Sequence, residues 1–192
     1  MNKLLLSLRN RKPNKTSLIR RFIAYAIDWY LGSVISSLPL IIIYLMLHPH
    51  AKRIPNQLSL FSFPINIFVG IICLAVAFGY YYLLPLLWHG QTLGKKLTRI
   101  KVVGYDGSEV TPMQLFVRQI IMMTLIEGSL FTSTTTIHQM LSSMINIKVV
   151  SMISRCGLFI SIVTIILLAI TNSHQALHDL VANTMVVSAS KE

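Results

Sequence analysis

The stretch from Arg20 to Leu47 combines the length of a membrane span with an internal carboxylate. It opens with two arginines, continues through apolar residues and carries Asp28 near its start. A helix needs about 20 apolar residues to cross the hydrocarbon core of a bilayer, so this stretch is long enough. A charge buried there costs at least a few kcal/mol unless it is paired or used. The sequence therefore predicts an integral membrane protein in which Asp28 has a partner or a function.

The overall composition supports this class. Of 192 residues, 54% are hydrophobic and only 12% are charged, as expected for one membrane domain. The net charge of +11 would suggest nucleic acid as partner in a soluble protein. Here the cations flank apolar segments, so the expected partners are the lipid bilayer and its anionic headgroups, and nucleic acid is not expected. The two cysteines show no pairing or CxxC spacing, so neither a metal nor a cofactor is predicted.

We predict an all-α integral membrane fold, a four-helix transmembrane bundle. The spans are expected near residues 18–47, 64–88, 113–136 and 156–172. Residues 1–17 form a basic N-terminal segment, residues 18–188 the transmembrane domain, and residues 189–192 a tail. The apolar stretch Met140–Ile153 is interrupted by Lys148 and several serines, so it is either interfacial or an extension of the last span.

The distribution of cations predicts the orientation in the membrane. The N-terminal segment, the loop after the second span with the foot of the third, and the tail hold thirteen of the 17 lysines and arginines. The other two loops hold four: Lys52, Arg53, Lys148 and Arg155. Because cytoplasmic loops are enriched in cations, both termini are expected in the cytoplasm of a multi-pass protein of the cell membrane.

The loop between the second and third spans is expected to be structured. Residues 98–104 alternate with β-branched side chains and are followed by Asp106-Gly107, which is typical of a hairpin turn. We therefore predict a small cytosolic hairpin or extended element. Thr111-Pro112 then indicates the start of the third span, because proline suits the first helical turn.

Arg21 and Asp28 lie two helical turns apart on the same face of the first span. Asp28 is expected about 9 Å below the point where the hydrocarbon begins after the arginines. Helical side chains tilt toward the N-terminus, so Arg21 leans away from Asp28 and each is expected to find a partner on another segment. Asp28 either pins the bundle through a buried bond or handles an ion or substrate directly.

Two further acids are candidates for the site. Asp179 follows the last span, together with His174 and His178, and these three groups either relay protons or form a polar helix end. Glu127 lies about 18 Å into the third span and faces away from Arg118. It is either protonated and hydrogen-bonded, or it lines a polar path with nearby hydroxyl side chains.

A glycine-containing basic segment closes the second span. Gly90, Gln91, Gly94, Lys95 and Lys96 could contact an anionic headgroup or a partner, as could Arg118 at the foot of the third span. The segment lacks the spacing of a nucleotide-binding loop. The alternative is a tight turn with lysines that reach the membrane surface. The sequence has no nucleophile–base arrangement, paired catalytic carboxylates or HExxH motif, so the protein is not expected to be an enzyme.

Three of these segments together resemble the RDD family of membrane proteins, which is named for an arginine and two aspartates. Residues 21–28 resemble its first-helix motif, residues 90–107 its central loop, and residues 177–184 its C-terminal motif. The resemblance implies that Arg21, Asp28 and Asp179 are the signature residues. The family usually has a basic residue where His174 stands and often glycine where Asn183 stands, and Glu127 matches none of its motifs.

The resemblance and the residues leave two functions open. One is an accessory, assembly or self-protection component of the cell membrane, without enzymatic activity and within a homo-oligomer or larger complex. It is suggested by the small size and the basic loop. The other is a small cation/proton-coupled transporter, in particular an antiporter, that uses Asp28 within the membrane. It is suggested by the acidic residues at membrane depth.

Overall fold

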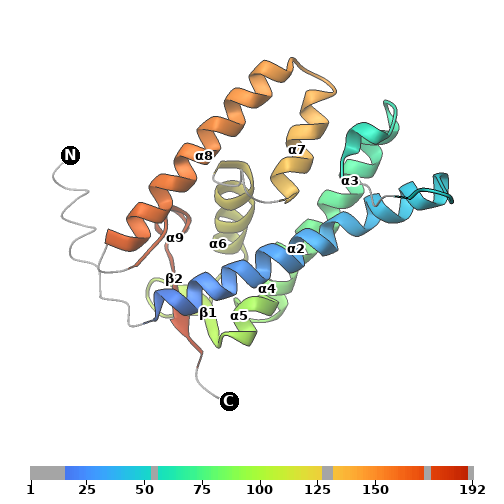
Figure 1. The fold of residues 1–192 in the computed structure, drawn as a ribbon. Coiled ribbons are helices and arrows are strands. Elements are labelled where there is room, and N and C mark those ends of the chain that lie inside the picture. Colours follow the sequence, from blue (N-terminus) through green and yellow to red (C-terminus); the bar gives the residue numbers. More distant parts are fainter. Residues whose placement is uncertain (1–15, 53–55, 127–131, 171–173, 190–192) are drawn as a thin grey trace.

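Three long apolar helices dominate the computed structural model, which describes residues 16–52, 56–126, 132–170 and 174–189 (Figure 1). They are α2 (Leu18–Leu47), the continuous helix Ile65–Leu87 and α8 (Ile147–Ile170), each long and apolar enough to cross a membrane. The expected spans at 18–47 and 64–88 are thereby confirmed as helices. The expected span at 156–172 lies largely within α8, which begins earlier, so residues 147–153 extend the last spanning helix.

Helix α2 presents one narrow buried stripe and is otherwise exposed. The buried residues are Arg21, Ala24, Asp28, Gly32, Ser36 and Leu40. Their spacing of three or four residues places them on one helical face. Large apolar side chains such as Phe22 and Tyr30 cover the remaining surface and face outward. This reversal of the soluble pattern suits a helix surrounded by lipid. It also places both predicted polar residues of α2 on the face that packs inward.

The helix Ile65–Leu87 consists of α3 (Ile65–Phe78), the π-helical turn η2 (Gly79–Leu83) and α4 (Leu84–Leu87). A short 3₁₀ turn, η1 (Leu58–Leu60), precedes it. Helix α3 packs along α2 in an antiparallel arrangement (Figure 1). Leu40 and Val69 from the two helices belong to an apolar core that Leu58 and Phe61 close at the end far from the chain's sheet.

The described part of the third predicted span, 113–136, contains no helix long enough to cross a membrane, and the predicted count of four spans is therefore not confirmed. The chain forms α6 (Pro112–Phe116) and the π-helix η3 (Val117–Ile126), together shorter than a span, and then α7 (Thr132–Ser142) beyond residues 127–131. The start of α6 is confirmed, because Thr111 and Gln114 form a capping box. Arg118 and Gln119 are buried within η3, and a run of threonines opens α7, so this region lacks the uniform apolarity of a span.

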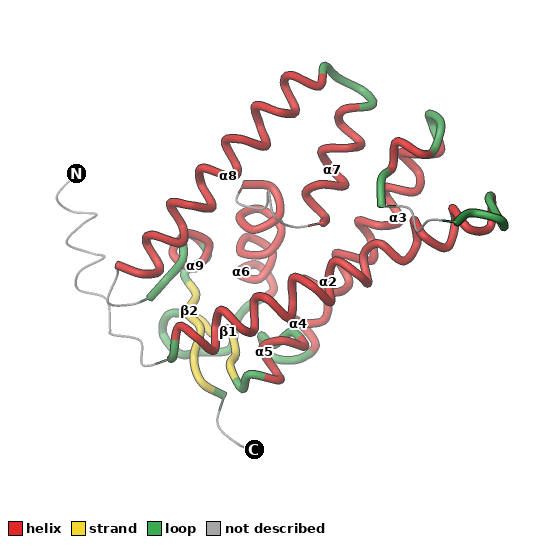
Figure 2. Tube along the Cα trace, in the orientation of Figure 1, coloured by secondary structure: helices red, strands yellow, loops and turns green. Residues whose placement is uncertain are grey.

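A two-stranded antiparallel sheet corrects the all-α prediction. Strand β1 (Ile100–Gly104) pairs with β2 (Thr184–Ser188), with Val102 opposite Val186 (Figure 2). The predicted turn is present, since Gly107 has a φ of 89° and Asp106 accepts a hydrogen bond from the Ser108 amide at 3.1 Å. However, the returning segment makes only an isolated bridge, Val103 with Glu109. The main partner of β1 therefore comes from the C-terminal segment.

The sheet lies at the end of the bundle where α2 begins and α8 ends, next to the short helices α5 (Leu93–Leu97) and α9 (Leu177–Val181) (Figure 1). We call this region the sheet end. Ala24 of α2 packs there against Ile100, Val102 and Val186 in an apolar cluster. The sheet is thus attached directly to the first turns of α2, close to Arg21 and Asp28.

Candidate functional site: two buried carboxylates at the sheet end

Asp28 is enclosed by donors from two other segments. Its residue is 5% exposed. Oδ1 accepts hydrogen bonds from the Tyr80 hydroxyl at 2.9 Å and from the Gly94 amide at 2.8 Å. Oδ2 accepts from the Thr92 hydroxyl and faces the Lys95 ammonium at 3.5 Å. The expectation that Asp28 finds its partners outside α2 is met by η2 and α5.

The sequence around α5 explains how these donors reach Asp28. Thr92 begins the helix, yet its hydroxyl does not cap it and donates to Asp28 instead. A Cβ on Gly94 would lie 2.4 Å from the Ala24 carbonyl oxygen, so only glycine permits this close contact between α5 and α2. The segment whose sequence suggests a contact for an anionic headgroup is therefore built around an internal carboxylate.

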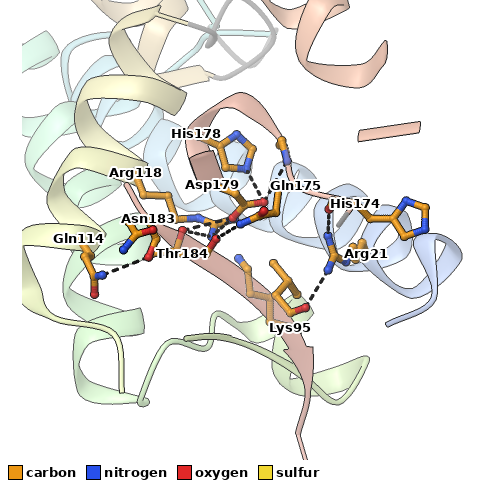
Figure 3. Close-up of polar contacts among 12 residues, drawn as sticks. Arg21, Lys95, Gln114, Arg118, His174, Gln175, His178, Asp179, Asn183 and Thr184 are labelled. Carbon is orange, nitrogen blue, oxygen red and sulfur yellow. Dashed lines mark hydrogen bonds and ion pairs between the residues drawn. The ribbon is translucent and has the colours of Figure 1, made fainter. Parts of the chain in front are cut away.

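Asp179 forms the second centre, with Arg118. The Nη1 of Arg118 lies 2.6 Å from Oδ1 of Asp179, and the two side chains are 4% and 2% exposed (Figure 3). The Ala176 amide donates to Oδ2 at 3.2 Å, and the Thr184 hydroxyl donates to Oδ1 at 3.3 Å. The ion pair joins η3 to α9, segments separated by 61 positions. It was not predicted from the sequence.

Arg21 ties the C-terminal segment to α2. Its guanidinium donates to the His174 carbonyl and, at 2.7 Å, to the Val186 carbonyl (Figure 3). Arg21 and Asp28 thus bind different segments, as their tilt on the helix predicts. Asn183, where the resembled family often has glycine, adopts a φ of 51°, and asparagine tolerates this left-handed conformation better than most residues do.

Lys95 connects the two centres electrostatically. Burial lowers the pKa of Lys95, and Arg118 lowers it further, while Asp28 and Asp179 act in the opposite direction. Three cations, Arg21, Lys95 and Arg118, thus share this buried region with two carboxylates. The arrangement is close to neutral overall, as a buried charge cluster must be to remain stable.

The lowered pKa of Asp179 predicts that the folded protein loses stability in acid. Burial alone would raise the pKa of Asp179, but Arg118, His178 and Arg21 outweigh it and hold the pKa below its usual range. The unfolded chain therefore binds this proton more readily, so the stabilisation is present above the unfolded pKa and is lost as pH falls through the folded pKa. We expect the thermal unfolding temperature of the detergent-purified protein to decrease as the pH is lowered from about 5 to about 3. Asp179→Asn should flatten this dependence, and equal slopes in both proteins would contradict it.

The remaining predicted site residues lie in different places. Glu127 is outside the described residues. The Nε2 of His178 is 3.9 Å from Oδ2 of Asp179, and the ring nitrogen Nδ1 of His174 is 3.1 Å from the Leu168 carbonyl. His178 thus faces Asp179, whereas the ring of His174 contacts the backbone of α8. Within the described ranges, no group of three or more His, Cys, Asp or Glu residues is placed to hold a metal ion.

The predicted headgroup-contact residues mostly turn inward. Gly94, Lys95 and Arg118 belong to the carboxylate centres. Gly90 has a φ of 87°, and a Cβ there would lie 2.1 Å from the Val102 carbonyl oxygen, while the Gln91 side chain donates to the Ile100 carbonyl. Lys96 is the exception, because it is exposed and its ammonium lies 4.4 Å from the centre of the Trp88 ring.

The site also contains residues that sequence reasoning missed. Tyr80, Tyr81 and Thr184 bind at the two centres, and Tyr81 donates to the Asp28 carbonyl at 3.1 Å. The available signal was the run of three tyrosines in the second span, 80–82. Side chains with hydroxyl groups at membrane depth require partners, and the aspartate on the first span is a natural acceptor.

Comparisons with known proteins match most of the chain. The model of the RDD family matches residues 15–183, a range that includes Arg21, Asp28, Arg118 and Asp179. A relative from Bacillus subtilis (strain 168), described as "Uncharacterized protein YckC", is 28% identical over 160 residues, which cover 83% of this chain and 78% of the relative. No solved structure matches the chain.

Proposed function

Because the chain belongs to the RDD family of membrane proteins, we propose that it is a non-enzymatic component of a membrane complex whose buried Arg–Asp network shapes a docking surface. One observation carries the proposal: each signature charge is already bound by groups of the same chain. Asp28 is enclosed by Tyr80, Thr92, Gly94 and Lys95, and Asp179 is paired with Arg118. These residues hold segments together, which supports a structural role for the network.

The exposed surface beside this network is both basic and apolar. Lys96 and Arg99 are exposed, and Leu97, which lies between them in the sequence, exposes most of its side chain. Leu87, the last residue of α4, exposes most of its side chain as well. Lysine over a tryptophan ring together with exposed leucines suits the interface between lipid tails and headgroups. We propose that the sheet end faces the cytoplasm of the cell membrane, in line with the distribution of cations, and that an acidic partner or headgroup meets it there.

Cross-linking in native membranes tests the accessory role. The tagged chain is expected to recover one partner at constant stoichiometry, and the double variant Lys96→Glu/Arg99→Glu should lose it. The matched control is Lys148→Glu, an exposed lysine at the opposite end of the bundle, which should retain the partner. Recovery of the chain alone, or a partner that both charge reversals leave unchanged, would contradict the proposal.

Cation/proton exchange is the second candidate function, and the position of Asp28 within the membrane-length helix favours it. The side chain lies early in a spanning helix and has an ammonium, Lys95, as a titratable neighbour. If the protein exchanges cations for protons, vesicles that contain the wild-type protein should show a cation-driven change of internal pH, and Asp28→Asn should abolish this change. Equal exchange in both proteins would remove Asp28 from the mechanism, and an absence of exchange in wild-type vesicles would reject transport.

A further inference from the structure

A cavity of about 180 Å³ lies among α3, η2, η3 and α7, away from the two carboxylates. Its wall is mostly apolar and includes Ala77, Tyr81, Ile120, Thr124, Ser133 and Ile137. Leu74, Ala77 and Phe78 belong to this wall and lie near the middle of the 23-residue helix Ile65–Leu87. The cavity is therefore at the depth of the lipid tails. Phe78 and Leu125 line it and are partly exposed, so it borders the outer surface of the bundle.

The hydroxyl of Ser133 is unsatisfied in this cavity. Ser133 is 4% exposed, and in the part of the chain that the structure describes its Oγ has no hydrogen-bond partner. The neighbouring hydroxyls are committed, because Thr124 donates to the Gln119 carbonyl at 2.8 Å and Thr134 donates to the Thr124 carbonyl at 2.7 Å. A buried polar group without a partner costs roughly 1–3 kcal/mol. Ser133 therefore offers a free hydrogen bond to a molecule that enters the cavity.

Two π-helical segments border the cavity from different sides. Tyr81 comes from η2, and Ile120, Thr124 and Leu125 come from η3. π-helical turns are rare and frequently occur at functional sites. In this chain they place Tyr81 and Thr124 at the same cavity, while Tyr81 also reaches the backbone of Asp28. The cavity wall is thus joined to the first carboxylate centre.

We propose that this cavity binds an uncharged, single-ring amphiphile whose one oxygen bonds to Ser133. An apolar cavity of about 150 Å³ holds a benzene ring, so the volume here fits one substituted ring. Among the described residues, the lining has no carboxylate, ammonium or guanidinium group to balance a charged ligand. A lipid tail would fill the space but leave the Ser133 hydroxyl unpaired, so an oxygen-bearing ring fits better. The inference is independent of the proposed docking role.

Fluorine NMR on protein in nanodiscs tests the site with 4-fluorophenol and with fluorobenzene, which lacks the hydroxyl. Empty nanodiscs supply the partition baseline. The wild-type protein should bind 4-fluorophenol saturably and roughly three- to tenfold more tightly than fluorobenzene, as one neutral hydrogen bond predicts. Ser133→Ala should abolish this preference while fluorobenzene binding persists. Ser143→Ala, at an exposed hydroxyl outside the cavity, should behave as wild type.

A filled cavity provides the second comparison. Ala77→Leu places extra volume in the cavity and should abolish saturable binding of both probes, and Ile137→Phe serves the same purpose if the first variant fails to fold. Signal that empty nanodiscs fully reproduce would overturn the proposal. Equal binding of both probes to the wild-type protein would also overturn it, because that result describes a crevice for lipid tails. Unchanged binding in a folded filled variant would place the probes elsewhere.

Discussion

Replacement of Arg118 by methionine is expected to lower the free energy of unfolding by about 3–5 kcal/mol. Methionine keeps the length of the side chain but leaves Asp179, whose side chain is 2% exposed, without the cation 2.6 Å away. An unpaired buried charge is costly, whereas the intact pair itself contributes little beyond a hydrophobic pair. Arg21 also acts on Asp179 electrostatically, so the loss should fall in the lower part of this range. Equilibrium unfolding in mixed micelles measures it.

The double variant Arg118→Met/Asp179→Leu distinguishes the cost of an unpaired buried charge from the cost of changed side-chain packing. Because it removes both charges, it should regain most of the stability that Arg118→Met loses. The control is Arg155→Met on α8, whose exposed guanidinium contacts the Ser151 hydroxyl at 3.0 Å and should matter little. A single Arg118→Met variant as stable as the wild type would show that Asp179 is neutral or well solvated in the folded protein.

The membrane helices could be predicted from the sequence because hydropathy and length act locally. Residues 18–47 form α2 as expected, and Arg21 and Asp28 lie on one face because they are seven positions apart. The tilt of helical side chains also correctly excluded a bond between them. The partners themselves could not be named, because Thr92 and Arg118 approach the acids only through tertiary packing across the bundle.

The errors have equally specific causes. The segment 90–96 contains the glycines and lysines of an anion site, but the anion it binds is the chain's own Asp28. Strand β2 pairs with β1, whose residues lie 80 to 88 positions earlier in the chain, a pairing that local turn signals cannot indicate. The third span is not confirmed, because the described helix Pro112–Ile126 is shorter than a span and buries the polar residues Arg118 and Gln119.

The second large effect is expected for Asp28→Ala. This change leaves the Tyr80 and Thr92 hydroxyls, the Gly94 amide and the Lys95 ammonium without their acceptor. Donors that lose a buried acceptor cost about 1–3 kcal/mol each when water cannot replace it, but the losses are not additive, so a total of about 3–5 kcal/mol is expected. Asp106→Ala is the control, at an exposed carboxylate whose hydrogen bonds stay within its own turn, and it should lower the unfolding midpoint much less.

Asp28→Asn then distinguishes a structural carboxylate from one that handles ions. Asparagine retains an acceptor for Tyr80 and Gly94, but its neutral side chain no longer balances Lys95. The pKa of Lys95, already lowered by burial, should fall further because the carboxylate that raises it is lost. A structural role predicts a smaller loss than in Asp28→Ala and recovery when Lys95→Met is added, since the unpaired ammonium is then removed. If Asp28 instead carries protons or cations, Asp28→Asn should keep its stability and lose exchange activity in vesicles. An Asp28→Asn protein that is as stable as the wild type would therefore contradict the proposal that the carboxylate of Asp28 holds α5 against α2.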